Sequence, residues 1–218
     1  MICGVDEAGR GPIFGPLVVA AVSFMDEELL ISLNVNDSKQ LSVKRRETLA
    51  KEIRKHAKKI EILIIPATDI DDMRKVMTIN EIEVFAFSKV IQKTNPELCY
   101  VDSADVNEER FAKDILSKIP IKPKIVSKHK ADEIYPIVSA ASIIAKTVRD
   151  NEIKIISKEL EKKLDIPLGS GYPADPITQE FLRTWVYKYK KLPPYVRKSW
   201  KTAKRIIDTN KLRRLDDF

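Results

Sequence analysis

Blocks of hydrophobic residues along the chain predict an alternation of strands and helices. Short apolar runs typical of buried strands occupy residues 2–6, 17–24, 60–66 and 97–103, and an edge strand is expected over residues 122–128. Segments with a helical pattern cover residues 42–59, 80–93 and 134–153, the last of them lined with small residues and expected to be largely buried. The first of these elements already resemble half of a mixed sheet.

Capping chemistry marks the starts of several helices. The residues concerned are Thr78 with Glu81, Asn107, and Asp175 before Pro176. Helices are expected to dominate the rest of the chain after this last start.

The composition is that of a folded protein with an ordinary core. The chain has 218 residues, of which 44% are hydrophobic, and this size suggests one domain or one domain with an appendage. No apolar run reaches the roughly 18 residues of a membrane helix and the N-terminus lacks the order of a signal peptide, so we expect a cytoplasmic protein. Cys3 and Cys99 lie in apolar strands, which argues against a disulfide or a zinc site.

Positive charge is concentrated near the C-terminus. Between Arg183 and Arg214 the chain has twelve Lys or Arg residues and one acid, Asp208, so this segment carries +11 against +7 for the whole chain. Aromatic residues are interleaved with the cations, namely Trp185, Tyr187, Tyr189, Tyr195 and Trp200. A charge run alone is most often a solvated helical face, but this excess of one sign with interleaved rings favours a polyanion partner such as nucleic acid.

A glycine-rich turn joins the first two predicted strands. The stretch "EAGRGPIFGP", residues 7–16, contains three glycines, but no helix follows it, so it does not fit a dinucleotide-binding loop. Gly9, Gly11 and Gly15 are either turn residues that need positive φ or bare backbone that lets a ligand approach. Arg10, between two of them, favours the second interpretation.

Acidic residues end two of the predicted buried strands. Asp6 closes the first strand and Asp102 the fourth, while Asp132 follows a cluster of cations. A divalent cation such as Mg²⁺ would compensate such charges, although each acid alone could equally cap a helix or pair with a lysine. A two-metal nuclease needs carboxylates to hold the metal ions and basic side chains nearby to offset the charge of the nucleic-acid backbone.

Five segments together resemble the signatures of ribonuclease HII, the type 2 ribonuclease H, in its archaeal form. They are "GVDEAGRGPIFGPLVVAAV", "NDSKQLS", "YVDS", "HKADEIYPIVSAASIIAKTVRD" and "GSGYPADP", and they follow in order along essentially the whole chain. The resemblance implies a ribonuclease H-like fold, with a mixed central sheet flanked by helices and a helical C-terminal extension. It also implies a ribonuclease H-like catalytic domain over residues 1–174, a basic helical C-terminal extension over residues 175–218, and a monomeric enzyme.

The resemblance assigns roles to particular residues. The metal-binding and catalytic acids would be Asp6, Glu7, Asp102 and Asp132. The backbone of Gly9, Arg10 and Gly11 would contact the 2′-hydroxyl of a ribonucleotide, and Tyr172 would stack on the adjoining sugar. Further matches, expected to contact phosphate, are Lys39, Ser139, Ser142 and Lys146, although the serines could simply be small residues for helix packing.

The activity implied is an endonuclease that cuts the RNA strand of RNA/DNA hybrids and DNA duplexes containing single ribonucleotides. Cleavage would fall on the 5′ side of the ribonucleotide and leave 3′-hydroxyl and 5′-phosphate ends, with two Mg²⁺ or Mn²⁺ ions activating water and stabilising the leaving oxygen. Such an enzyme serves DNA replication and repair. With only His56 and His129, a two-histidine ribonuclease fits poorly.

Two other functional classes remain open, and the C-terminal tail suggests a sliding clamp as a partner. A non-catalytic nucleic-acid-binding protein would leave the acids at the strand ends unexplained, and a junction resolvase or transposase-like nuclease would not need Gly9–Gly11 or Tyr172. The C-terminal tail partly resembles a motif that docks on a sliding clamp, with Leu215 and Phe218 as its hydrophobic part, but Leu212 replaces the usual glutamine. An exposed disordered end is the alternative for this tail.

Overall fold

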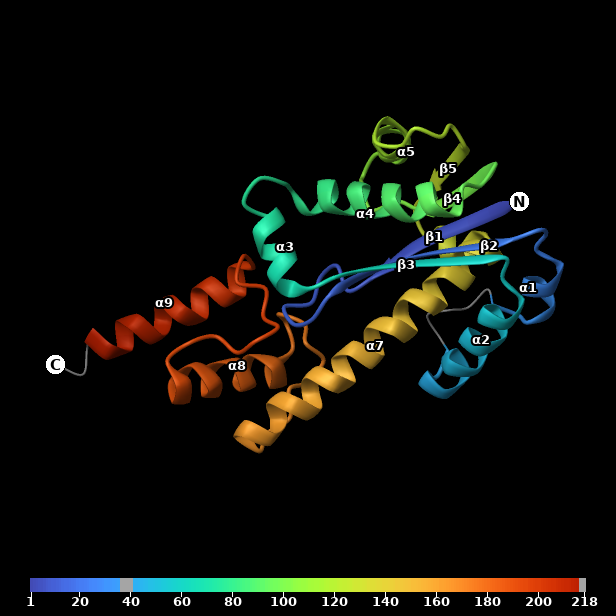
Figure 1. Cartoon of the computed structure of the whole chain (residues 1–218). Coiled ribbons are helices and arrows are strands. Elements are labelled where there is room, and N and C mark those ends of the chain that lie inside the picture. The colour runs from blue at the N-terminus through green and yellow to red at the C-terminus, as the bar shows by residue number, and fades with distance from the viewer. Residues whose placement is uncertain (36–40, 216–218) are drawn as a thin grey trace. The chain divides into compact units, whose positions relative to one another are not determined.

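The computed structural model describes residues 1–35 and 41–215, with side chains described up to Thr209 (Figure 1). The chain forms two compact units built from interleaved segments. One comprises Met1–Ala8, Val18–Ile64 and Met77–Val148, and the other comprises Gly9–Leu17, Ile65–Val76 and the chain from Arg149 onward. The predicted boundary between residues 174 and 175 stays a prediction. Lys39 lies outside the described residues.

The first unit is built on a five-stranded mixed sheet. Its strands are β1 (Ile2–Ala8), β2 (Leu17–Phe24), β3 (Lys59–Ile65), β4 (Leu98–Asp102) and β5 (Lys124–Lys128). The strand order is β3-β2-β1-β4-β5, with β1 antiparallel to β2 and parallel to β4, and β4 parallel to β5. All five predicted strands are present, including β5 at the edge of the sheet, but β1 is two residues longer than predicted and ends at Ala8.

Helices cover both faces of this sheet (Figure 1). Those of the first unit are α1 (Glu28–Ser32), α2 (Val43–His56), α4 (Ile79–Thr94), α5 (Glu108–Ser117), α6 (Ala131–Ile134) and the first part of α7 (Pro136–Leu164). One core is formed by β2, α2 and α7, while α4 packs against β1 and α5. Within the described ranges, no helix is long and apolar enough to cross a lipid bilayer.

A close approach between β1 and α7 depends on Gly4. A Cβ atom at Gly4 would lie 2.1 Å from the carbonyl oxygen of Ile137, so only glycine fits there. The small residues predicted to line this helix, among them Ala140, Ala141 and Ala145, are fully buried. The start of α7 therefore packs directly under β1, which carries two of the predicted acids.

The second unit has its own apolar core. It contains α3 (Ala67–Met73), α8 (Pro176–Tyr189), α9 (Lys201–Leu215) and the second part of α7. The ring of Phe14 meets that of Phe181 edge-on, with centroids 6.0 Å apart, and Phe181 stacks on Trp185. The glycine-rich turn is joined to the C-terminal region by a β-bridge between Phe14 and Val196.

Local signals located most helix boundaries. The caps at Thr78 with Glu81, Asn107 and Asp175 are all confirmed. The helix expected over residues 42–59 ends at His56, because Ala57 is extended and Lys59 already belongs to β3. The short helices α1 and α3 were not predicted, and α7 continues to Leu164. Both cysteines are free and buried, as expected.

Candidate active site

Two of the predicted acids lie side by side on β1 and β4, which are neighbouring strands in the middle of the sheet. Asp6 belongs to β1 and Asp102 ends β4, and these strands run parallel with Val5 opposite Val101. Because the register places the next residues side by side, Asp6 and Asp102 lie next to each other. Asp102 ends β4, but the prediction that Asp6 closes the first strand is wrong, because β1 continues through Glu7 to Ala8, paired with β2. Asp6 is only 3% exposed, and its Oδ1 accepts a hydrogen bond from the amide of Glu7 at 2.7 Å.

The environment of Asp6 opposes its ionisation. Burial raises the pKa of Asp6 well above its usual range, and the charges of Glu7 and Asp102 raise it further. The Ser142 hydroxyl and the Lys146 ammonium act in the opposite direction. A buried acid thus lies within electrostatic reach of two further carboxylates, and a cation bound there would relieve their repulsion.

Asp132 is buried next to a lysine of α7. It lies in the first turn of α6 and is 3% exposed, with its Oδ2 atom 3.8 Å from Nζ of Lys146. Because Lys146 also lowers the pKa of Asp6, its ammonium lies within electrostatic reach of both carboxylates. The neighbouring Glu133 has a side chain 46% exposed and lies 4.0 Å from Lys130. Asp132, which the resemblance names as a metal ligand, is thus the buried one of the two adjacent acids.

The four acids are not arranged as a finished metal site. Among the residues that the structure describes, no group of three or more His, Cys, Asp or Glu side chains could hold a metal ion as it stands. The donor set nevertheless fits Mg²⁺ or Mn²⁺, because carboxylate oxygens are their preferred protein ligands and because Asp6 is buried near other carboxylates. Binding would require the carboxylates to turn toward a common point.

The two serines of α7 are fully buried. The hydroxyl of Ser139 donates a hydrogen bond to the carbonyl of Val35, and Ser142 faces Asp6. This position supports the packing alternative for Ser139, whereas Ser142 is better placed to influence the acids. The phosphate contacts assigned to these residues stay predictions.

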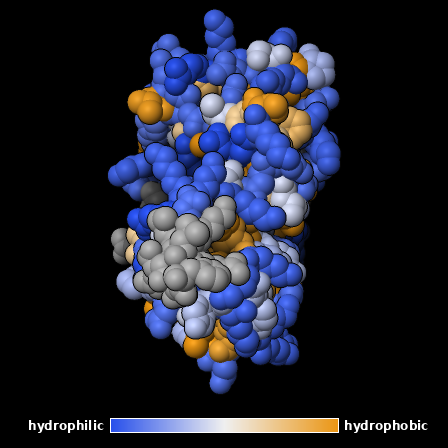
Figure 2. Space-filling view, turned by 90° about the vertical axis from the view of Figure 1, so that its left-hand side faces the viewer, coloured by the Kyte–Doolittle hydropathy of each residue, from blue (hydrophilic) through white to orange (hydrophobic). Residues whose placement is uncertain are grey.

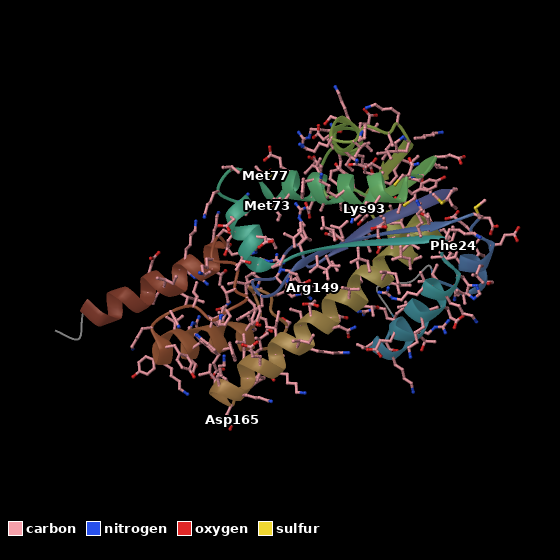
Figure 3. All side chains as sticks on the ribbon, viewed as in Figure 1. Phe24, Met73, Met77, Lys93, Arg149 and Asp165 are labelled. Carbon is pink, nitrogen blue, oxygen red and sulfur yellow. The ribbon has the colours of Figure 1, made fainter. Side chains whose placement is uncertain are left out.

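The glycine-rich turn and Tyr172 lie together in the second unit. Gly9 has φ +92°, and a Cβ there would lie 2.5 Å from the Pro16 carbonyl oxygen and 2.6 Å from Nε of Arg149, a residue labelled on α7 in Figure 3. Gly11 is exposed, and its hypothetical Cβ would lie 3.5 Å from the ring of Tyr172. That ring is 48% exposed. A bare backbone and an accessible aromatic face are therefore adjacent, as the resemblance implies.

A capped turn fixes the segment that carries Tyr172. The Asp175 carboxylate accepts hydrogen bonds from the amide and hydroxyl of Ser170, both at 2.6 Å, and from the amide of Ile177 at 3.0 Å. The amide of Asp175 donates to the carbonyl of Tyr172 at 3.1 Å. Hydrogen bonds from Ser170 are the main cause that lowers the pKa of Asp175 to about 2.

Replacing Asp175 with alanine is expected to lower Tm at neutral pH by about 2–4 °C, as the loss of a helix cap does in a protein of this size. Because the folded state favours the carboxylate, the contribution of Asp175 is complete above its ordinary pKa of 3.8 and is lost as the pH falls through about 2. Thermal denaturation followed by circular dichroism should show the two Tm values converging over this range. A pH-independent difference would contradict the assignment.

The basic C-terminal segment exposes only some of its rings. Trp185 is buried in the core of the second unit, so the expectation that it faces a polyanion is wrong. Tyr187 is exposed beside Lys190, whose Nζ lies 4.6 Å from the ring centroid. Figure 2 views the side on which α8 and α9 lie in Figure 1 and shows a mostly hydrophilic surface.

Sequence reasoning missed three residues around the turn, namely Arg149, Arg197 and Trp200. Arg149 and Arg197 are buried, and Arg197 and Trp200 make hydrogen bonds to the turn. Their spacing along the chain gives no signal for these contacts, because each one joins segments far apart in sequence. Within the basic segment, Arg197 resembles the neighbouring surface cations.

Comparisons with known proteins agree on one family. The family model of ribonuclease HII matches residues 3–203. The chain is 46% identical over 216 residues to the ribonuclease HII of Methanosarcina barkeri, covering 94% of this chain and 95% of that protein. The ribonuclease H2 structure from Pyrococcus horikoshii OT3 has a TM-score of 0.89 and 38% identity, covering 96% of this chain and 98% of that one.

A second solved structure, "Structure of the PCNA:RNase HII complex from Archaeoglobus fulgidus", contains a chain that matches with a TM-score of 0.84 and 43% identity, covering 94% of this chain and 96% of that one. The expected ribonuclease H-like fold is confirmed by these matches. This chain therefore belongs to the ribonuclease HII family and is a ribonuclease H.

Proposed function

We propose that the enzyme cleaves the RNA strand of RNA/DNA hybrids and DNA duplexes that contain a single ribonucleotide, on the 5′ side of that ribonucleotide. The products would carry 3′-hydroxyl and 5′-phosphate ends. The observation that carries this proposal is the buried position of Asp6 among Glu7 and Asp102, with Lys146 near both Asp6 and Asp132. We place the activity in the cytoplasm, in DNA replication and repair, with the enzyme acting as a monomer.

Asp6, Glu7, Asp102 and Asp132 would hold two divalent ions, Mg²⁺ or Mn²⁺. When bound, the ions supply an activated water and stabilise charge on the scissile phosphate. The chain's own contribution is a set of carboxylates held in place by the fold. The amide of Ala131, for example, donates to Oδ1 of Asp102 at 2.8 Å. Lys146 would offset part of the negative charge that Asp132 and Asp6 bring to the site.

Recognition of ribose would fall to the glycine-rich turn. Gly11 has no side chain and is exposed beside the Tyr172 ring, so a sugar can approach the backbone while stacking on the ring. The 2′-hydroxyl would hydrogen-bond with the peptide groups of Gly9, Arg10 and Gly11. The basic segment from Arg183 would bind the duplex through its phosphates, which gives affinity without sequence preference.

A cleavage assay on matched duplexes tests this function. Three duplexes of one sequence are compared: all-DNA, DNA with one ribonucleotide, and an RNA/DNA hybrid, each with Mg²⁺, with Mn²⁺ and with chelator. We expect metal-dependent cleavage of the second and third duplexes and none of the first, and mass spectrometry of the products should give the ends stated above. A protein that only binds nucleic acid would cleave none of them.

Equal cleavage of the all-DNA duplex would instead favour a junction resolvase or transposase-like nuclease. Failure to cut the duplex with one ribonucleotide would overturn the proposal. Because all three duplexes share one sequence and length, differences in general duplex affinity cannot imitate selection for ribose.

We further propose a sliding clamp as partner, because the matching structure from Archaeoglobus fulgidus is named as a complex of RNase HII with PCNA. The candidate contact is the tail with Leu212, Leu215 and Phe218, whose side chains lie outside those that the structure describes. Titration of the full-length protein and of a protein lacking residues 212–218 against an archaeal clamp should give saturable binding for the first alone. Equal binding by both, or none by either, rejects the tail as the docking motif.

A further inference from the structure

The carbonyl groups of the glycine-rich turn are held by one buried arginine. Arg197 is fully buried, and its guanidinium donates three hydrogen bonds to the turn. Nη2 donates to the carbonyl of Gly9 at 2.5 Å, Nη1 to that of Arg10 at 2.8 Å, and Nε to that of Gly15 at 3.0 Å. Since the guanidinium is planar and rigid, it fixes the directions of these carbonyls relative to one another.

Trp200 holds the next carbonyl of the same turn. Its indole Nε1 donates to the carbonyl of Gly11 at 3.1 Å, and its ring centroid lies 4.8 Å from Cζ of Arg197. Three consecutive carbonyls, those of Gly9, Arg10 and Gly11, are therefore bound by two side chains that also contact each other. On its other side, Gly9 faces the side chain of Arg149.

Fixing a carbonyl also fixes the amide of the following residue. In a trans peptide the C=O and the N–H of one planar unit point in opposite directions. The carbonyls of Gly9 and Arg10 point toward Arg197, so the amides of Arg10 and Gly11 point away from it. These amides belong to the peptide groups that would meet the 2′-hydroxyl.

We propose that Arg197 and Trp200 are positioning residues for ribose selection, which orient the peptide groups of Gly9, Arg10 and Gly11. The proposal rests on the proposed function of this turn, because it assumes that the turn reads the 2′-hydroxyl. Neither side chain needs to touch the substrate. Loss of either would let the peptide groups rotate, so that part of the selectivity for ribose over an analogue without the hydroxyl would be lost.

Two conservative variants separate positioning from packing. Trp200→Phe keeps an aromatic ring against Arg197 but removes the Nε1–H donor. Arg197→Lys keeps the positive charge but removes the planar set of N–H donors that the guanidinium provides. Ser199→Ala is the matched control, since the Ser199 hydroxyl lies in the same segment but donates to Asp71 at 2.6 Å. The kcat and KM are measured for duplexes with one ribonucleotide and with one 2′-fluoro-2′-deoxynucleotide at the same position.

We expect Trp200→Phe to lower the ratio of kcat/KM between the ribose and 2′-fluoro substrates by about three- to tenfold, the usual effect of one hydrogen bond. Arg197→Lys should lower it further, and Ser199→Ala should leave it unchanged. A merely structural role would lower kcat/KM for both substrates equally and leave the ratio constant. That constant ratio in Trp200→Phe would overturn the proposal even if Arg197→Lys failed to fold.

The wild-type enzyme distinguishes this failure from failure of the proposed function. If wild type prefers ribose over the 2′-fluoro substrate and Trp200→Phe keeps that preference, only the positioning role is wrong. If wild type shows no preference, the proposed reading of the 2′-hydroxyl fails, and the positioning role fails with it.

Discussion

Asp132→Asn is expected to lower turnover by roughly a hundredfold or more, whereas Glu133→Gln should stay close to wild type. The two acids are adjacent in sequence and both lie in the first turn of α6. Asp132 is buried and paired with Lys146, while Glu133 is half-exposed beside Lys130. Removing the buried carboxylate deletes a proposed metal ligand, but removing the exposed one loses only a surface ion pair, typically worth about 0–1 kcal/mol.

The measurement is kcat at saturating duplex with one ribonucleotide, over a range of Mg²⁺ and Mn²⁺ concentrations, together with calorimetric titration of Mn²⁺ into each variant. We expect weakened Mn²⁺ binding in Asp132→Asn alone. Circular dichroism must show that both variants fold. The reverse ranking of the two variants would move the metal role to Glu133.

The sequence predicted those parts of the fold that local chemistry determines. The capping box of Thr78 with Glu81 and the cap at Asp175 satisfy amides within a few residues, so their spacing along the chain is enough to find them. The helix expected over residues 42–59 was too long, because pairing in the sheet draws Lys59 into β3 and the sheet partner of β3 lies elsewhere in the chain. Tertiary pairing here overrides a local helical pattern.

The candidate site also has residues that the sequence identified and residues that it did not. The resemblance assigned Asp6 and Asp102 to one site, and the parallel pairing of β1 with β4 brings them side by side. The burial of Trp185 and the contacts of Arg197 could not be predicted from the sequence, because both depend on how distant segments pack. The side chain of Arg197 reaches a turn near the other end of the chain, and in the sequence Arg197 is one of many cations of the basic segment, with nothing beside it that marks it as buried.

Tyr172→Ala should lower cleavage of the duplex with one ribonucleotide by roughly tenfold to a hundredfold, since stacking on one aromatic ring is typically worth about 1–3 kcal/mol. The Tyr172 ring is 48% exposed and lies beside Gly11, so its removal leaves the core of the second unit intact. Duplex affinity should change much less, because the basic segment from Arg183 supplies most of the phosphate contacts.

Tyr172→Phe is the matched control for the ring, since it removes only the hydroxyl and should keep most of the cleavage rate. Cleavage is measured in single-turnover reactions and affinity by fluorescence anisotropy without divalent metal, at two salt concentrations. A ring packed against the following sugar also leaves little room for a second hydroxyl, so wild type should prefer a junction from RNA to DNA, and Tyr172→Ala should lose that preference. If Tyr172→Ala lowers affinity and cleavage by the same factor, Tyr172 contributes only to general binding, and its role at the junction is wrong.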